Sequence, residues 1–247
     1  MPGTEQSYIG KGSIYLGPAD GSAKARPIGN CGKLELAISE DKKELPDYQS
    51  AGGGVANSIS RISGIEASIT LHDISPENLA LAVFGSTSAV TAGTVTDESH
   101  TAYLGGLVRL NNLPDTATIV VTDSAGTTTY VLDTDYTVNG AGIVPLDTGS
   151  IADGSTILVD YTKKVGNVVQ AVVNSGQEFA LTFVGLNEAQ SGKPVVVDLY
   201  RVKFSPTQGL GFIGDEFAAM DLTGSVLKDT SKSGAGVSQY FKVEQAA

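Results

Sequence analysis

The sequence predicts a mainly β protein made of antiparallel sheets, with one short helix, and three observations indicate this fold class. Its 247 residues include 30 glycines and no tryptophan, a composition that suits many short strands joined by turns. Several segments alternate apolar and polar residues with the period of two that belongs to a strand with one buried face. Residues 75–85, by contrast, have apolar side chains four residues apart, as in a helix.

The first two clear strands are predicted at residues 32–39 and 64–72, which read GKLELAIS and GIEASITLH. In each, apolar residues alternate with polar or small ones, so each strand has one buried and one hydrated face. The hydrated face carries Lys33 and Glu35 in the first strand and Glu66 in the second.

Residues 40–61, which separate these two strands, are predicted to form a long surface loop. They contain charges of both signs, a proline and three consecutive glycines, and they far exceed the length of a hairpin turn. Folding alone does not account for such a loop. We therefore expect it to contact a partner, and to be mobile until it does.

A short helix is predicted at residues 75–85, SPENLALAVFG. Ser75 suits the N-cap, Pro76 suits the first helical position, and Glu77 favours the positive end of the helix dipole. Gly85 is expected to end the helix. The helix is apolar nearly all round, so we expect it to pack against the face of a sheet.

Four further strands are predicted in the C-terminal part, at residues 178–186, 195–206, 217–227 and 238–245. The second, VVVDLYRVKFSP, is unusual because strict alternation makes both of its faces mostly apolar while each face carries charge. Alternation also places Asp198 and Arg201 on opposite faces. Their partners are then expected either on another chain or on another strand of the same chain.

The stretch 88–165 differs in composition from the segments on either side. It holds nine acidic and three basic residues, a net charge of −6 in a chain whose total is −11. Short strands alternate there with turns, one at 123–126 and one at Asn139-Gly140, which is a strong hairpin signal. This spacing predicts a small immunoglobulin-like sandwich inserted into a first domain. The predicted domains are therefore 1–87 together with 166–247, and 88–165.

Charge and hydropathy exclude several classes of function. A net charge of −11 argues against a general nucleic-acid binder and against a surface that seeks anionic membranes. No apolar run approaches the ~18 residues of a transmembrane helix, so no membrane insertion is expected. The first ten residues lack a signal peptide's pattern, and Cys31 is the only cysteine, so we expect folding in a reducing cytoplasm.

No group of residues has the pattern of a catalytic or metal site. The two histidines, His72 and His100, fall in different predicted domains, and the second lies in a segment that reads as a linker. The motif DTDY at 133–136 lacks the further ligands of a calcium loop and is expected to be a turn. The sequence therefore predicts no enzyme, no metal and no cofactor.

The runs SGKPVVVDLYRVKFSP (191–206) and FAAMDLTGSVLKD (217–229) resemble the major tail tube proteins of long-tailed, siphovirus-type bacteriophages. The likeness covers 176–229, and the strand–helix order of 30–87 agrees with it. It implies a structural virion protein, of which six copies pair strands edge to edge into a ring-shaped β-barrel. Four strands per subunit at ~4.8 Å give a bore about 37 Å across before tilt, enough for duplex DNA.

The resemblance further implies that the rings stack into a tube through which the genome passes into the host. The partners would be further copies of the chain and, at the tube ends, the tape measure, terminator and distal tail proteins. Double-stranded DNA would pass through without specific binding. The protein would be located in the virion tail after assembly in the host cytoplasm.

Three sets of candidate site residues follow from the resemblance and the strand faces. The residues expected to face the lumen are Lys33, Glu35, Glu66, Ser68, Thr70 and His72. The loop residues expected to mediate ring stacking are Glu40, Asp41, Lys42, Lys43, Glu44, Asp47 and Tyr48. The residues expected at the boundary between subunits are Asp198, Tyr200 and Arg201.

An alternative function remains open at this point. The chain could be a host-surface-binding, adhesin-like β protein whose immunoglobulin-like segment recognises carbohydrate, because that segment is small, polar and expected to be exposed. A hydrolase is a third candidate, for which the sequence offers no catalytic residues.

Overall fold

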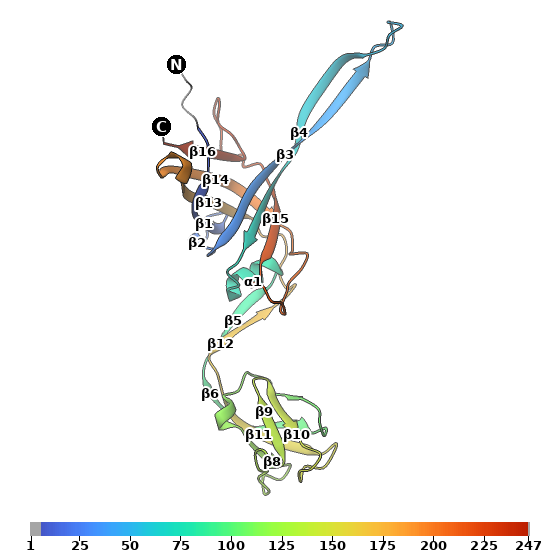
Figure 1. Cartoon of the computed structure of the whole chain (residues 1–247), viewed down its shortest axis with the longest axis vertical. Helices are drawn as coiled ribbons and strands as arrows, with labels where there is room; N and C mark the ends of the chain where they lie inside the picture. Colours follow the sequence, from blue (N-terminus) through green and yellow to red (C-terminus); the bar gives the residue numbers. More distant parts are fainter. Residues whose placement is uncertain (1–5, 247) are drawn as a thin grey trace. The chain divides into compact units, whose positions relative to one another are not determined.

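The computed structural model describes residues 6–246 and has half of its residues in strands and 5% in helix, so the prediction of a mainly β fold is confirmed (Figure 1). The strand pairs with a defined register are antiparallel. Within residues 6–246 no sheet closes into a barrel. The chain forms two compact units, residues 1–87 with 169–247 and residues 88–168, which are described in turn.

The first unit is built on one eight-stranded sheet. Along the sheet the strands are β2 (Arg26–Pro27), β1 (Gly10–Pro18), β13 (Phe179–Asn187), β14 (Lys193–Phe204), β15 (Met220–Val226), β4 (Val55–Leu71) and β3 (Cys31–Pro46), with β16 (Phe241–Gln245) paired to β14. One edge of β14 is paired with β13. The other edge is shared, with β16 beside Val195–Leu199 and β15 beside Val202–Phe204.

A β-bulge in β14 corrects the expectation that this strand has two apolar faces. Leu181 of β13 lies opposite Leu199 and Phe179 lies opposite Val202, so Tyr200 and Arg201 together face one residue. An extra residue shifts the alternation by one. Leu199 and Val202 are therefore both buried, and the apolar residues on either side of the bulge share one face. The second face is mostly polar and needs no cover.

The buried face forms one core with helix α1 (Pro76–Ala82). This core takes residues from β1, β4, β13, β14 and β15, including Ile14, Ile69 and Leu222, and Ala82 of the helix is fully buried in it. A bulged strand that pairs with different neighbours along its length lets a sheet bend over its own core. The helix packs against the sheet, as its all-round apolar sequence predicts.

The start of α1 matches the sequence prediction and its end does not. Ser75 is the N-cap, and its hydroxyl oxygen accepts a 3.2 Å hydrogen bond from the Asn78 N–H. At the other end Val83 is the C-cap, and Phe84, not Gly85, has a left-handed φ of 53°. Gly85 is needed for another reason, since a Cβ there would lie 2.5 Å from the carbonyl oxygen of Gln170.

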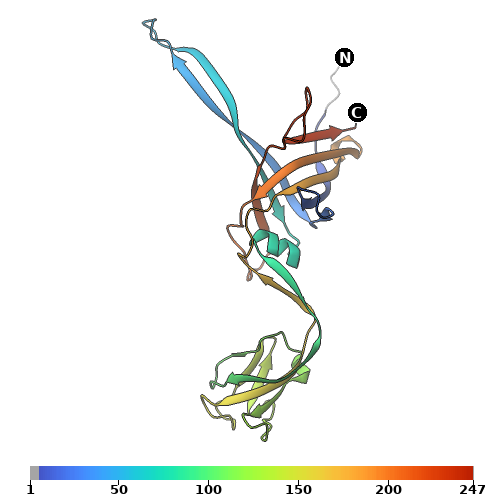
Figure 2. The same ribbon diagram turned by 180° about the vertical axis from the view of Figure 1, so that it is seen from behind.

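The expectation that residues 40–61 form a mobile loop is wrong. β3 and β4 stay paired from Cys31–Leu71 out to Pro46–Val55, and only the tip between them is a turn. β15 pairs with β4 only at Glu66–Leu71, so residues 38–64, called the arm below, extend beyond the neighbouring strands as a two-stranded ribbon (Figures 1 and 2). At the tip, Gly53 and Gly54 have positive φ values of 64° and 133°, which favour glycine.

The arm was missed because both of its faces are hydrated. With no buried face, neither strand shows a continuous apolar alternation, and charges occur on both sides of the ribbon. The pairing that begins in the core continues outward past a β-bulge at Ser39–Glu40.

The second unit consists of two three-stranded sheets. One has the order β7 (Val108–Arg109), β10 (Gly142–Pro145), β9 (Tyr136–Asn139), and the other has β6 (Gly93–Thr101), β11 (Thr156–Lys163), β8 (Val120–Asp123). Residues of both sheets, among them Ile143 and Ile157, belong to one buried core. A 3₁₀ helix, η1, covers Thr116–Thr118.

Two predicted hairpins of this unit differ in outcome. The turn at Asn139-Gly140 joins β9 to β10 as expected. After the turn at 123–126, however, residues 127–132 form no strand, only isolated bridges from Thr129 to Thr122 and from Leu132 to Tyr136. Strand β6 and the two-stranded sheet of β5 (Ser86–Val90) with β12 (Gly166–Gln170) had not been predicted.

Candidate functional site

The candidate lumen residues of the two strands lie on one face of the eight-stranded sheet. Lys33 lies opposite Thr70, and Glu35 lies opposite Ser68. Glu66 follows on the same face of β4, by the strand period of two. The opposite face carries core residues such as Ile69. These five residues therefore form a continuous hydrated surface above a solid core.

β15 and β14 add residues to this surface that the sequence analysis missed. Asp221, Thr223 and Ser225 lie opposite Thr70, Ser68 and Glu66, and Lys203 lies opposite Ser225. The set called the polar face below is Lys33, Glu35, Glu66, Ser68, Thr70, Lys203, Asp221, Thr223 and Ser225. The signal was present, because MDLTGSV alternates as regularly as the two strands that were used.

The charges of the polar face are partly paired. Lys33 Nζ lies 2.5 Å from Glu35 Oε2, and the Thr70 hydroxyl donates a 2.6 Å hydrogen bond to Asp221 Oδ1. The hydrogen bond to Glu35, assisted by its charge and more weakly by Asp221, raises the pKa of Lys33. With two lysines against three carboxylates the surface is weakly acidic, so it offers DNA no continuous set of cations.

His72 is placed just beyond this surface. β4 ends at Leu71, and the His72 backbone N–H donates to the carbonyl oxygen of Asn30 over 2.9 Å. Its ring lies over Gly32, where a Cβ would come within 2.7 Å of Nε2. Gly32 is the extra residue of a bulge, so the ring covers the end of β3.

The charges on β14 have partners within the chain. Arg201 donates from Nε and Nη2 to Glu178 Oε2, at 2.9 and 2.6 Å, and from Nη1 to the Lys228 carbonyl. Asp198 accepts a 2.7 Å bond from the Thr182 hydroxyl and lies 3.3 Å from Lys242 Nζ. Of the two alternatives left open for these charges, the structure shows pairing within the same chain: Asp198 pairs with β13 and β16, and Arg201 pairs with the residues just before β13 and just after β15.

Tyr200 lies at the bulge, half-buried, with its ring 5.1 Å from Lys232 Nζ. A cation above an aromatic face is attracted by the ring quadrupole. The three residues predicted for the subunit boundary therefore sit on the face of the sheet away from the core, each held by contacts inside the unit.

The arm carries the predicted stacking residues on both of its faces. Six large apolar side chains are at least 55% exposed there: Ile38, Leu45, Tyr48, Val55, Ile59 and Ile62. Among the charges, Lys42 and Glu44 form a 2.5 Å ion pair. Apolar side chains in such number on an exposed ribbon are typical of a surface that contacts a partner.

Asp47 starts the tip, and the remaining charged stacking candidates lie on β3 ahead of it. The Asp47 carboxylate accepts a hydrogen bond from the Gln49 N–H at 2.8 Å, and its own N–H donates to Gly54 over the same distance. Bonds from Ser50 and Gln49 lower the pKa of Asp47. Glu40, Asp41 and Lys43 face Ile62, Arg61 and Ile59 across the ribbon.

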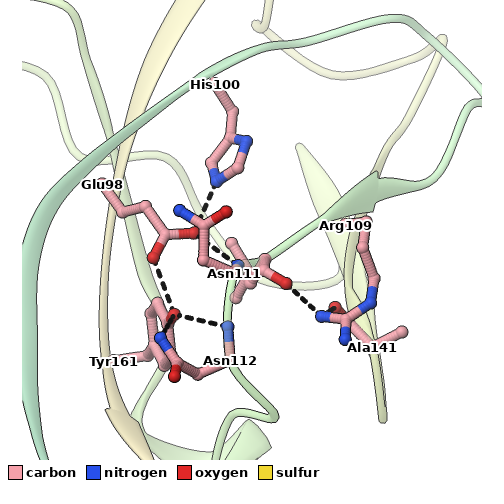
Figure 3. Close-up of polar contacts among 8 residues, drawn as sticks. Glu98, His100, Arg109, Asn111, Asn112, Ala141 and Tyr161 are labelled. Atoms are coloured by element: carbon pink, nitrogen blue, oxygen red, sulfur yellow. Dashed lines mark hydrogen bonds and ion pairs between the residues drawn. The ribbon is translucent and has the colours of Figure 1, made fainter. Parts of the chain in front are cut away.

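The second unit contains a half-buried polar cluster that corrects the placement of His100. The residue lies in strand β6, and its Nε2 is 2.6 Å from Glu98 Oε1 (Figure 3). Glu98 also accepts 2.8 Å and 2.7 Å bonds from the Asn111 N–H and the Tyr161 hydroxyl. Burial by itself would raise the pKa of Glu98, but these bonds outweigh it and lower the pKa.

The hydrogen bonds of this cluster link separate segments of the second unit. Both oxygens of the Glu98 carboxylate accept hydrogen bonds, and the Asn112 N–H donates a 3.2 Å bond to the same Tyr161 hydroxyl (Figure 3). Arg109 nearby donates to the carbonyls of Leu110 and Ala141. The cluster joins β6 and β11 to the segment after β7.

In the described part of the chain, no three His, Cys, Asp or Glu residues are grouped to hold a metal ion. In the DTDY turn the Asp135 carboxylate accepts 2.7 Å hydrogen bonds from the Val131 and Ser150 N–H groups. No helix within residues 6–246 is long and apolar enough to cross a membrane.

Comparison with known proteins gives a family for nearly the whole chain. No curated protein matches the sequence. A family model does match residues 7–244, which include both compact units and the arm. The chain therefore belongs to the family described as protein of unknown function UCP028589.

Proposed function

We propose that this chain is the major tail tube protein of a long-tailed bacteriophage. Six copies form a ring, the rings stack into a tube, and the tube conducts double-stranded DNA to the host. The observation that carries the proposal is the sheet of the first unit, which has one face in the core, one hydrated face of mixed charge, and a free edge along the 16-residue strand β3.

The free edge supports ring closure. Among the described residues, β3 pairs only with β4 along its 16 residues, and β1 pairs with β2 only at Tyr15 and Leu16. Long unpaired edges expose backbone hydrogen-bonding groups, and folded proteins usually block them. Pairing between the β3 edge of one copy and an edge of the next extends the sheet around a ring.

The polar face supports the role of lumen lining. Four strands, β3, β4, β15 and the end of β14, contribute to it, as six subunits of four strands would require. A conduit must not hold its cargo, because each Lys–phosphate contact releases counterions and adds affinity. A surface with both signs of charge and a small acidic excess lets the duplex slide.

The arm supports the stacking of rings. Its exposed apolar residues are covered when the arm lies on the adjacent ring. At the tube ends, the partners are the tape measure, terminator and distal tail proteins.

The second unit supports a role outside the tube wall. It has its own core of two three-stranded sheets and serves as an immunoglobulin-like insertion. In this proposal the chain is not an enzyme, needs no cofactor or metal, and is located in the virion.

Electron microscopy of the concentrated protein tests the proposal. We expect six-membered rings or tubes, both for the wild type and for a variant in which a short Gly/Ser bridge joins Thr87 to Val169 and replaces the second unit. Assembly by the shortened chain is expected because each unit has its own core. Monomers at every concentration would contradict the proposal and favour a host-surface-binding protein.

A further inference from the structure

The segment between β14 and β15 exposes three large apolar side chains. Residues 211–217 read GFIGDEF, and Phe212, Ile213 and Phe217 are 79%, 100% and 99% exposed. Such residues on a folded surface usually mark a contact with another molecule. We call residues 211–217 the aromatic tip.

The aromatic tip is held out from the unit by anchored residues on both sides. Before it, the Thr207 N–H donates a 2.8 Å hydrogen bond to the Ala82 carbonyl at the end of α1, and Leu210 packs against the core. After it, Met220 is fully buried in β15. The tip is therefore displayed on a fixed base rather than at the end of a free tail.

The same unit contains an apolar pocket beside α1 whose volume is about 360 Å³. Its apolar lining comes from the helix and from three strands of the sheet: Leu16, Leu81, Phe84, Phe179 and Phe204. This volume is near the lower end of the range for ligand pockets, and it suits one or two aromatic side chains. Phe179 and Phe204 already stack in a tilted pair with ring centroids 6.0 Å apart.

The rim of the pocket has the opposite charge to the tip. Lys24 and Arg26 lie on the rim with one acid, Glu77, whereas the tip carries Asp215 and Glu216. Among residues 6–246, neither acid of the tip forms an ion pair or a hydrogen bond in the structure.

Arg26 is also held in place for binding. Its Nη1 donates a 2.8 Å bond to the Asn78 side-chain oxygen, and Asn78 is only 1% exposed. The Asn78 amide nitrogen in turn donates to the carbonyls of Ile28 and Asp73, both at 2.8 Å. A cation whose position is fixed by a buried amide loses little freedom when a carboxylate binds.

We propose that the aromatic tip of one copy inserts into the α1 pocket of a second copy. Phe217 or Phe212 occupies the apolar floor, while Asp215 and Glu216 meet Lys24 and Arg26 at the rim. In one copy the tip is fully exposed and so lies outside its own pocket. Tip and pocket are different patches, so this contact is heterologous, and repeating it builds a ring or a filament rather than a closed dimer. The inference rests on the self-assembly in the proposed function and names a contact within it.

Disulfide trapping between two chains tests the contact directly. In a Cys31→Ser background, one chain carries Phe217→Cys and a second chain, of different mass, carries Ser175→Cys on the exposed pocket rim. We expect a mixed dimer on mild oxidation. As a matched control, Val131→Cys, which is exposed in the second unit, replaces Phe217→Cys and should give none. Equal trapping by Phe217→Cys and by the Val131→Cys control would overturn the inference. A chain that carries both Phe217→Cys and Ser175→Cys gives a further check, because a purely intrachain disulfide would also overturn it.

A charge exchange provides the second measurement. Glu216→Lys and Lys24→Glu should each raise the concentration needed for assembly by about tenfold, and mixing the two variant chains should recover part of that loss. The control variant Tyr103→Ser, in the second unit, should leave the concentration needed for assembly unchanged. If tubes form in all variants at the wild-type concentration, this contact is wrong while the proposed function stands. If trapped dimers form but no rings or tubes do, the contact stands and the proposed function fails.

Discussion

The two halves of the β3–β4 hairpin make a direct comparison, because they belong to the same two strands, which stay paired throughout apart from single-residue bulges. In the inner half, Ile69 and Leu71 of β4 are at most 1% exposed and belong to the core. In the arm, Ile59 and Ile62 of the same strand are more than half exposed. Backbone pairing thus continues where burial ends. The inner half serves folding, and the arm is free to serve a partner.

Removing the outer arm should produce the largest effect. Replacing Leu45–Asn57 with Asn-Gly joins Glu44 to Ser58, which already face each other, through a two-residue turn. We expect the chain to stay folded, with an unfolding free energy within about 1 kcal/mol of wild type, because no core residue is lost. Tubes should not elongate, as seen by electron microscopy, although single rings can form. Long tubes at the wild-type concentration would remove the arm from the stacking contact.

A matched pair of isoleucines in β4 tests the comparison by stability. Ile69→Ala should lower the free energy of unfolding by about 2–5 kcal/mol, because it leaves a cavity in the core. Ile59→Ala, ten residues earlier in the same strand, should change it by no more than about 0.5 kcal/mol, because that side chain is 56% exposed. Denaturant unfolding of dilute, unassembled protein gives both values. Similar losses for the two variants would show that the arm packs on the unit in solution.

Charge reversal is expected to have the smallest effect, and it tests the polar face of the inner half by DNA passage. Glu35→Lys with Glu66→Lys on the polar face should leave tubes intact but make them retain duplex DNA, more strongly at low salt, where screening is weak. The control pair, Asp133→Lys with Asp147→Lys at exposed positions of the second unit, changes the net charge equally and should retain less. Equal retention by both pairs at every ionic strength would place the polar face outside the bore.

The comparison also explains which residues sequence reasoning could find. Strand segments with one buried face were predictable, because Leu34, Leu36 and Ile69 alternate with polar residues at the period of the strand. The same alternation in β15, the neighbour of β4 in the sheet, indicates Asp221 and Thr223 as polar positions. The N-cap at Ser75 was equally local, since its hydroxyl reaches a backbone N–H three residues away.

The sequence by itself therefore determined the mainly β class, the start of the helix and the polar positions of the inner strands. Tertiary structure decided the rest. The bulge at Tyr200 and Arg201 depends on how β13 and β14 register, the partner of Arg201 is a glutamate 23 residues away, and Gly85 is required by the distant Gln170 carbonyl. The arm has no buried face to impose a pattern on its residues. Local sequence records the contacts of neighbouring residues and the burial of a repeating face, whereas these features arise from pairing between segments distant in the chain.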